Sequence, residues 1–311
     1  MIEKQELLEI LNNNYEKIFT DATFHRDGGS LSYIVFSNED KYFLRVIRPE
    51  MLATAYQAID IHTFLQVCNF AVPPIVFTKD DQSFITRKTD GKINLLVLYE
   101  YIEGKEPSNG DIENVGELIA KLHNIMESYP KELKNRDKHF FIDRYVDILR
   151  SKNDHTVGEY ERLGNMLWGK VKDLPKGFCH CDLYSGNIMK SDNGKLYVLD
   201  FDTSCNGFPM YDITLFCNET DYFAYSDEKF HESELSLQHF LKGYMKHRNL
   251  TEEEIQAFYY FQVIYHFQLQ ATIVEIYGID CNPDDFEDKQ LDWITSWMNK
   301  AEQEKGIVFY I

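Results

Sequence analysis

The stretch of sequence that decides the fold runs from His180 to Asn187 and reads HCDLYSGN, and Asp200 follows thirteen residues after Asn187 in the segment LDF. Asp and Asn side chains offer carboxylate and amide oxygens, the hard donors that Mg²⁺ prefers. Asp182 or Asn187 alone is better explained as a loop residue whose side chain bonds to backbone groups. Their spacing, with Asp200 in register on the next predicted strand, favours a metal site held by Asn187 and Asp200.

The spacing H-x-D-x-x-x-x-N is typical of the catalytic loop of kinases. Phosphoryl transfer holds the terminal phosphoryl of ATP in line with an acceptor hydroxyl, while a divalent ion neutralises charge on the phosphate oxygens. We therefore expect Asp182 to accept or orient the hydroxyl proton, with ATP and Mg²⁺ as cofactors. Asp212 is expected to cap a helix and brace the loop. Asp202 either contacts a second metal ion or faces solvent.

A glycine-rich turn near the start of the chain contains Gly28, Gly29 and Ser30. Glycines let a backbone approach phosphates closely and offer N–H groups, although a plain hairpin turn explains them equally well. One strand later comes Arg45, where kinases place a phosphate-binding cation; the alternative is a solvated strand Arg. Arg can bind phosphate with two parallel hydrogen bonds. Asp60 is the nearest acidic candidate for its partner.

Hydrophobic patterning changes once along the chain. Short apolar or aromatic runs bounded by turn residues predict a small antiparallel sheet before residue 100, with a leading helix within 2–18 and another over 53–67. The polar, turn-rich stretch that follows predicts a linker. We therefore expect a nucleotide-binding lobe at 1–102, a hinge at 103–110 and a catalytic and substrate-binding lobe at 111–311. The expected strands are 23–24, 32–36, 42–47, 75–77, 83–86 and 94–99.

The second part is predicted to be mostly helical. Apolar residues recur at helical spacing from Val115 to Ile125, in a helix that Asp111 is positioned to cap, and again over 233–247. A further helix is expected to open with the capping box Thr251-x-x-Glu254 and to end near Gly278. One strand at 196–200, preceded by an Asn-Gly turn, interrupts the helices. The overall class is therefore α+β.

Composition limits the partners. The formal net charge of −19 disfavours nucleic acid and anionic membranes, and either solubility or attraction of cationic ligands explains it. The six cysteines are scattered, and the start of the chain lacks an apolar signal, so we expect a cytoplasmic protein with reduced thiols. Cys179, His180 and Cys181 lack a second ligand pair at zinc spacing. The uncharged run 256–274 is interrupted by Gln and His, and we interpret it as a buried helix.

From about Phe24 to about Ala271 the chain resembles the aminoglycoside phosphotransferase and choline kinase superfamily, small-molecule kinases with the two-lobed protein-kinase fold. The segments that carry the resemblance are HCDLYSGN, LDFD, the Gly28–Ser30 loop, LRV around Arg45, YEYIEG at 99–104, GELIAKLH at 116–123, MYDI at 210–213 and FLKGYM at 240–245. It implies Gly28, Gly29 and Ser30 over the phosphates. It also implies adenine docked against the hinge, with the Glu100 carbonyl and Ile102 amide as partners and Tyr99 behind the base.

The chain departs from this family at Cys181, where Gly is usual, and at Arg45, where aminoglycoside enzymes have Lys and choline kinases have Arg. We expect the acceptor to be an amino sugar, an amino alcohol or a homoserine-like metabolite; a cationic acceptor would suit the acidic second lobe, whose acidity solvation explains equally well. The alternatives are a protein Ser/Thr kinase of the bacterial stress-response type and a catalytically silent nucleotide-binding protein. The acidic residues are Glu219, Asp221, Asp227, Glu228, Glu232, Glu234, Glu275, Asp280, Asp284 and Asp285.

Overall fold

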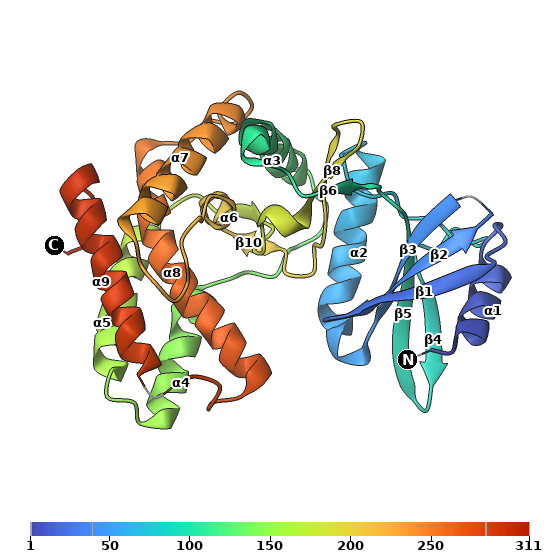
Figure 1. The fold of residues 1–311 in the computed structure, drawn as a ribbon, viewed down its shortest axis with the longest axis horizontal. Coiled ribbons are helices and arrows are strands. Elements are labelled where there is room, and N and C mark those ends of the chain that lie inside the picture. The colour runs from blue at the N-terminus through green and yellow to red at the C-terminus, as the bar shows by residue number, and fades with distance from the viewer. Residues whose placement is uncertain (1, 39, 284, 311) are drawn as a thin grey trace. The chain divides into compact units, whose positions relative to one another are not determined.

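The computed structural model describes residues 2–38, 40–283 and 285–310 (Figure 1). They form two compact units, Met1–Pro107 with Ser185–Thr203, and Ser108–Tyr184 with Ser204–Ile311. The hairpin that carries Asn187 and Asp200 therefore belongs with the N-terminal part of the chain. The segment HCDLYSGN is divided between the units, with Asp182 in the second and Asn187 in the first.

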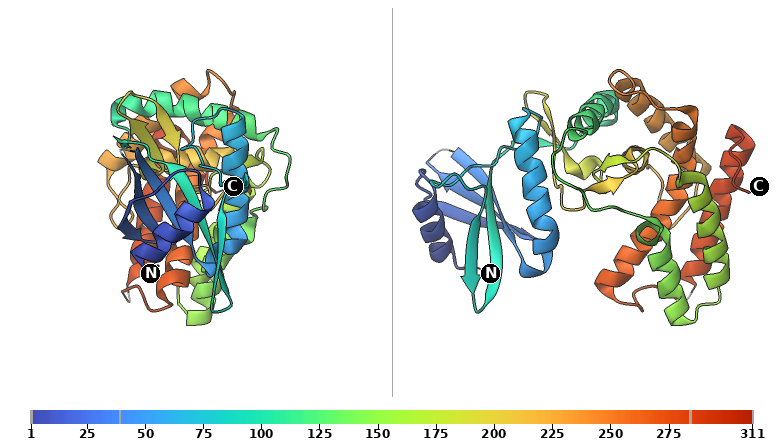
Figure 2. Two further views of the ribbon diagram at one scale, coloured as in Figure 1. Left: turned by 90° about the vertical axis from the view of Figure 1, so that its right-hand side faces the viewer. Right: turned by 180° about the vertical axis from the view of Figure 1, so that it is seen from behind.

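The first unit is built on a five-stranded antiparallel sheet of order β1-β2-β3-β5-β4. β5 is buried on both faces, because Leu95, Val97 and Tyr99 alternate with Leu96 and Leu98. The first face packs on helix α2 (Leu52–Val67) and the second on α1 (Lys4–Asn14), so the helices cover opposite faces (Figures 1 and 2). The strands are β1 (Asp21–Asp27), β2 (Leu31–Ser37), β3 (Asp40–Ile47), β4 (Ile85–Thr89) and β5 (Lys92–Glu100).

A second, three-stranded sheet completes this unit, with β6 (Gly104–Lys105) beside β8 (Ile188–Ser191) and β9 (Leu196–Val198). The β8–β9 turn contains Gly194 at φ +85°, a left-handed conformation that favours glycine. The strand expected at 75–77 was wrong, since only an isolated bridge joins Ile75 to Tyr99. Pro73 and Pro74 precede it and cannot donate ladder hydrogen bonds.

The second unit is mostly helical. Two of its helices cross closely at Gly116 of α3 and Gly243 of α7, where a Cβ would collide with the backbone of the opposite helix. A short antiparallel pair, β7 (Gly177–Cys179) and β10 (Cys205–Gly207), leads into the segment with Asp182. The helices are α3 (Ile112–Met126), α4 (Arg144–Lys152), α5 (Val157–Val171), α6 (Pro209–Phe216), α7 (Asp227–Tyr244), α8 (Glu252–Tyr277) and α9 (Phe286–Lys305), with a π-helical turn at His139–Asp143 and a 3₁₀ turn at Asn109–Asp111. The 3₁₀ turns Pro49–Met51 and Ser185–Asn187 belong to the first unit.

Helix ends test the sequence signals directly. The capping box of α8 is confirmed, because Thr251 Oγ1 accepts from the Glu254 amide and Glu254 Oε2 accepts from the Thr251 amide, and the helix ends at Gly278. Asp111 precedes α3 as expected, but its carboxylate accepts from Ser108 instead of capping that helix. Among the described residues, no helix has the length and apolarity that crossing a bilayer demands.

Candidate active site

Arg45 on β3 organises the polar cluster of the first unit. Its Nη2 donates to Asp202 Oδ2 at 2.7 Å and lies 3.4 Å from Ser30 Oγ, and its Nη1 lies 3.4 Å from Asp200 Oδ1. The structure thus brings together Ser30, Arg45 and Asp200 from three separate parts of the sequence. The sequence offered Asp60 as the nearest acidic candidate for the partner of Arg45, but the structure pairs Arg45 with Asp200 and Asp202. Contact of Asp202 with a second metal ion stays a prediction.

The electrostatics of this cluster follow from burial and from opposite charges. Burial alone would lower the pKa of Arg45, but the carboxylates of Asp200 and Asp202 outweigh it and raise that pKa. Tyr99 lies beside the same guanidinium, and burial raises its pKa to about 12. Arg45 is therefore a permanent cation and Tyr99 a neutral phenol at physiological pH.

The glycine-rich turn leaves open space. A Cβ built on Gly28 would meet no atom within 4 Å, and one on Gly29 would only touch Met51 Cε at 4.0 Å. Neither glycine has a positive φ, so backbone strain does not explain them. A missing side chain at these positions leaves open space next to Ser30, and contact of this turn with phosphates stays a prediction.

The two expected metal ligands lie at one end of the β8–β9 hairpin. Asn187 immediately precedes β8, Asp200 follows shortly after β9, and the Leu199 amide donates to the Asn187 carbonyl at 2.9 Å. Asn187 is 7% exposed, whereas the Asp200 side chain is 36% exposed. An amide and a carboxylate oxygen at one hairpin end fit a Mg²⁺ ion, because both are hard donors.

The expected adenine-binding residues follow the end of β5. Tyr99 is buried against His62 with ring centroids 5.0 Å apart, and the Glu100 amide donates to Pro74 O at 2.8 Å. Ile102 is half-buried, and within the described residues its amide makes no backbone hydrogen bond. Contact of this edge with a base stays a prediction.

In the second unit, Asp212 holds the segment that precedes Asp182. Its carboxylate accepts from the amides of His180 at 2.6 Å and Cys181 at 2.8 Å, and it lies 3.1 Å from His123 Nε2. Burial would raise the pKa of Asp212, but these hydrogen bonds lower it. The structure agrees with the expectation that Asp212 braces the loop before Asp182. The expected cap was wrong, because Asp212 lies inside α6, whose N-cap is Phe208.

Asp182 itself is exposed, and its carboxylate lies near Tyr211 and Tyr265. Burial and the nearby Asp182 carboxylate raise the pKa of Tyr265 to about 12, and the same carboxylate acts on Tyr211. Sequence reasoning missed Tyr265, because nothing in the pattern of α8 distinguishes it. Convergence of Asp182 with Asn187 and Asp200, which lie in the other unit, stays a prediction.

Three thiols gather next to this segment. The sulfurs of Cys179, Cys181 and Cys205 lie within 4.8 Å of one another, because β10 pairs Cys205 directly opposite Cys179. Hydrogen bonds from the other two thiols lower the pKa of Cys205 to about 5. Cys181 has φ 67°, a left-handed conformation that glycine adopts more readily than cysteine.

The acidic residues of the second unit do not form one free surface. Several are ion-paired, among them Asp227 with Lys300, Glu234 with Lys305 and Glu275 with Arg144. Asp284 lies outside the described residues. These pairs weaken the case for a cationic acceptor that rested on the acidity of this lobe.

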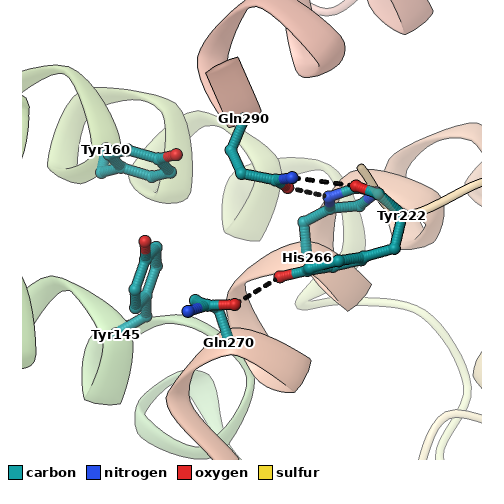
Figure 3. Close-up of a pocket in the computed structure, with 6 residues that line it drawn as sticks. All are labelled: Tyr145, Tyr160, Tyr222, His266, Gln270 and Gln290. Atoms are coloured by element: carbon teal, nitrogen blue, oxygen red, sulfur yellow. Dashed lines mark hydrogen bonds between the residues drawn. The ribbon is translucent and has the colours of Figure 1, made fainter. Parts of the chain in front are cut away.

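A small polar cavity also lies inside the second unit (Figure 3). Its walls are hydrogen-bonded to one another: Tyr222 donates to Gln270 at 2.8 Å, and His266 Nδ1 lies 2.6 Å from Gln290 Oε1. The walls stand too close together for a water-sized molecule. The cavity is therefore part of the packed interior and not an acceptor site.

Comparison with known proteins assigns the class. The chain matches the phosphotransferase enzyme family over residues 21–248, and it belongs to that family. A homoserine kinase from Zymomonas mobilis is 24% identical over 243 residues, covering 73% of this chain and 72% of the relative. Homoserine kinases from Rhizobium meliloti and Granulibacter bethesdensis are 26% and 32% identical, with 50% and 46% of this chain covered. The chain spans about half the length of these two relatives, 49% and 45%.

Solved structures agree on the fold. An amicoumacin kinase superposes with a TM-score of 0.72 at 16% identity, covering 98% of this chain and 94% of that one. A microcompartment-associated aminopropanol kinase gives a TM-score of 0.71 at 16% identity, covering 98% and 99%. At these identities the likeness concerns the fold alone, and it confirms the protein-kinase-like α+β class expected from the sequence.

Proposed function

We propose that this protein transfers the terminal phosphoryl group of ATP to a hydroxyl group of a small molecule. Family membership supports the reaction class, and related folds were solved with AMP-PNP in an amicoumacin kinase and with ADP in a spectinomycin phosphotransferase. The homoserine kinases among its relatives favour a homoserine-like acceptor over an amino sugar. No observation on this chain favours the protein-kinase or the silent alternative.

The observation that carries the proposal is the cluster of Ser30, Arg45 and Asp200. It combines an open glycine turn, a permanent cation and a carboxylate 3.4 Å from that cation. A surface aspartate without a binding role would not need a neighbouring arginine and an open glycine turn. Such a cluster suits the terminal phosphates of a nucleotide, because Arg45 would neutralise charge on the phosphate oxygens directly and Asp200 would do so through the metal ion that it binds.

The residues divide the work as follows. Gly28, Gly29 and Ser30 cover the phosphates, and Arg45 binds them. Asn187 and Asp200 hold Mg²⁺, which supplies charge neutralisation when it is bound.

Asp182 accepts the proton of the acceptor hydroxyl while the hydroxyl oxygen forms the new bond to phosphorus. The bond from phosphorus to the bridging oxygen of ADP breaks, and that oxygen leaves with the electron pair.

The experiment is a coupled assay of ADP release with Mg²⁺, ATP and a panel of hydroxy amino acids, amino alcohols and aminoglycosides, with protein substrates in a separate arm. Asp182→Ala should lower kcat by about 10²- to 10⁴-fold and leave ATP affinity unchanged. Asp200→Ala should weaken binding of the metal–nucleotide complex. Asp173→Ala, on an exposed residue of the second unit, is the control that should behave like the wild type.

Three results would count against the proposal. Phosphoryl transfer to protein substrates and to no small molecule would indicate a protein kinase instead. Stabilisation by Mg-ATP without turnover on any acceptor would indicate a silent nucleotide-binding protein. A near-normal rate for Asp182→Ala would remove that residue from the mechanism.

A further inference from the structure

One arginine of the second unit, Arg136, has no carboxylate partner among the residues that the structure describes. The other four arginines of that unit, Arg144, Arg150, Arg162 and Arg248, each form an ion pair with a glutamate or aspartate. In the part of the chain that the structure describes, the guanidinium of Arg136 has neither an ion pair nor a hydrogen bond, and its Nε is buried. This is unusual in a chain with 51 acidic and 32 basic residues.

Arg136 is held in place by its backbone and by an aromatic ring. Its amide donates to Asn206 O at 3.0 Å, which ties it to the strand β10. Its guanidinium carbon lies 3.9 Å from the centre of the Phe140 ring. A guanidinium stacked on an aromatic ring keeps the N–H groups at its own edge available for a planar, bidentate contact with a carboxylate.

A second cation stands beside it. The guanidinium carbon of Arg144 lies 4.8 Å from the centre of the same Phe140 ring. Burial lowers the pKa of Arg144, Glu275 raises it, and the charge of Arg136 lowers it further. Two neighbouring cations, only one of them paired, leave a local positive potential in an otherwise acidic unit.

This positive spot is linked to the segment of Asp182 through neighbouring elements. β10 pairs with β7, which leads directly to Asp182, and Arg144 is electrostatically coupled to Tyr211 and Cys181. Arg144 also contacts Gln268 and Thr272 of α8, one and two turns after Tyr265, the tyrosine beside Asp182. Adjacent strands and helices therefore connect the proposed base with Arg136.

We propose that Arg136 binds a carboxylate group of the acceptor, so that the acceptor is a hydroxy acid or hydroxy amino acid and not a simple amino alcohol. The inference rests on the proposed phosphoryl transfer and refines its substrate class. The carboxylate pairs with the half-buried guanidinium of Arg136 and offsets its repulsion with Arg144. The acceptor is thereby oriented with its hydroxyl toward Asp182.

Three acceptors that differ by one group test the proposal. L-Homoserine carries a carboxylate and an ammonium group, 4-hydroxybutyrate only the carboxylate, and 3-amino-1-propanol only the ammonium group. With Mg-ATP, we expect kcat/KM to be highest for L-homoserine and higher for 4-hydroxybutyrate than for 3-amino-1-propanol. Equal or better transfer to 3-amino-1-propanol would overturn the carboxylate site.

The matched variant is Arg136→Met, which keeps an unbranched chain against Phe140 and removes the charge. It should raise KM for L-homoserine and 4-hydroxybutyrate by about 10- to 100-fold, the usual effect of losing a hydrogen bond to a charged group, and leave KM for 3-amino-1-propanol unchanged. Arg136→Lys should recover part of the loss. Arg150→Met, an exposed arginine of α4, is the control with the same charge change. A rise in KM for all three acceptors alike would reduce Arg136 to a structural role and overturn the proposal.

Binding measured without turnover separates the two levels of inference. Calorimetric titration of L-homoserine into protein with Mg²⁺ and AMP-PNP should show weaker binding for Arg136→Met than for the wild type. Unchanged binding overturns the Arg136 site. If the wild type phosphorylates other acceptors but none with a carboxylate, only this inference fails; if it phosphorylates nothing in the panel, the proposed function fails.

Discussion

The carboxylates of the two units are used in opposite ways. In the second unit, Asp212 is fully buried, and the protein itself supplies its hydrogen-bond donors, two backbone amides and His123. In the first unit, the side chains of Asp200 and Asp202 are 36% and 14% exposed and share one arginine. Asp212 is enclosed by the fold, whereas the side chain of Asp200 stays accessible to solvent beside its arginine.

This difference separates stability from binding. A buried charge with all its partners holds the chain in one conformation, and its loss leaves those partners unsatisfied. A half-exposed carboxylate can exchange protein contacts for water or metal. We therefore expect changes around Asp212 to act on the free energy of unfolding, and changes around Arg45 to act on nucleotide affinity.

The largest effect is expected for Asp212→Ala. Removing this carboxylate strands His123 and the amides of His180 and Cys181 in a buried site, so the free energy of unfolding should fall by about 3–5 kcal/mol. Urea unfolding followed by circular dichroism measures it. Asp147→Ala, which removes an exposed carboxylate, should stay close to the wild type. A loss as small as in that control would contradict the enclosed role of Asp212.

The enclosed role of Asp212 was only partly visible in the sequence. Its position in the segment MYDI suggested bracing, but the cap assigned to it required a helix start that the structure places at Pro209. Local patterns predicted α8 well, because its capping box and terminal glycine are short-range signals. Helix α7 begins at Asp227, before the expected 233, because its first turn is acidic and lacks an apolar period.

Long-range pairings were the part that the sequence could not predict. Asp202 pairs with Arg45 across 157 positions, and Cys205 meets Cys179 only because β10 returns beside β7. The candidate residues Arg45, Ser30 and Asp200 lie together in the structure, and their roles stay predictions. The unpaired state of Arg136 has no local signature, since it depends on which carboxylates the fold brings near.

The next effect compares the units through pH. Each unit contains a buried histidine whose pKa burial lowers to about 4, His62 in the first unit and His266 in the second. The unfolded chain binds these protons near pH 6.5, so stability is full above that pH and falls as pH decreases toward 4. The loss should reach about 3 kcal/mol for each histidine, at about 1.36 kcal/mol per pKa unit.

The measurement is the free energy of unfolding between pH 6.5 and 4.5. His62→Gln and His266→Gln should each flatten its dependence on pH by a similar amount, because the two side chains are similarly buried. A slope that neither substitution changes would show that other groups control the acid sensitivity. Unequal flattening would show that the two units differ in how tightly they enclose a neutral ring.

A smaller effect is expected where α3 and α7 cross. A Cβ on Gly243 would overlap the Glu113 carbonyl, so Gly243→Ala should push the helices apart and destabilise the protein by about 1–3 kcal/mol. Gly169→Ala on α5 is the matched control, since its Cβ would meet nothing within 4 Å. That control should be neutral or slightly stabilising, because Ala favours helix. Equal melting temperatures for the two variants would show that the crossing tolerates a methyl group.

The smallest effect concerns the left-handed residues, Cys181 in the second unit at φ 67° and Asp200 in the first at φ 56°. A non-glycine residue in this region is strained, and glycine is not. Cys181→Gly should therefore raise the free energy of unfolding by about 0.5–1 kcal/mol, because it relieves the backbone strain. Unlike Asp200, Cys181 is not expected to bind a ligand. Asp200→Gly relieves the same strain but removes a carboxylate from the ligand-facing cluster, so its stability should rise while Mg-ATP affinity falls. Destabilisation by Cys181→Gly would show instead that contacts with Cys179 and Cys205 outweigh the strain, and that the thiol cluster stabilises the segment before Asp182.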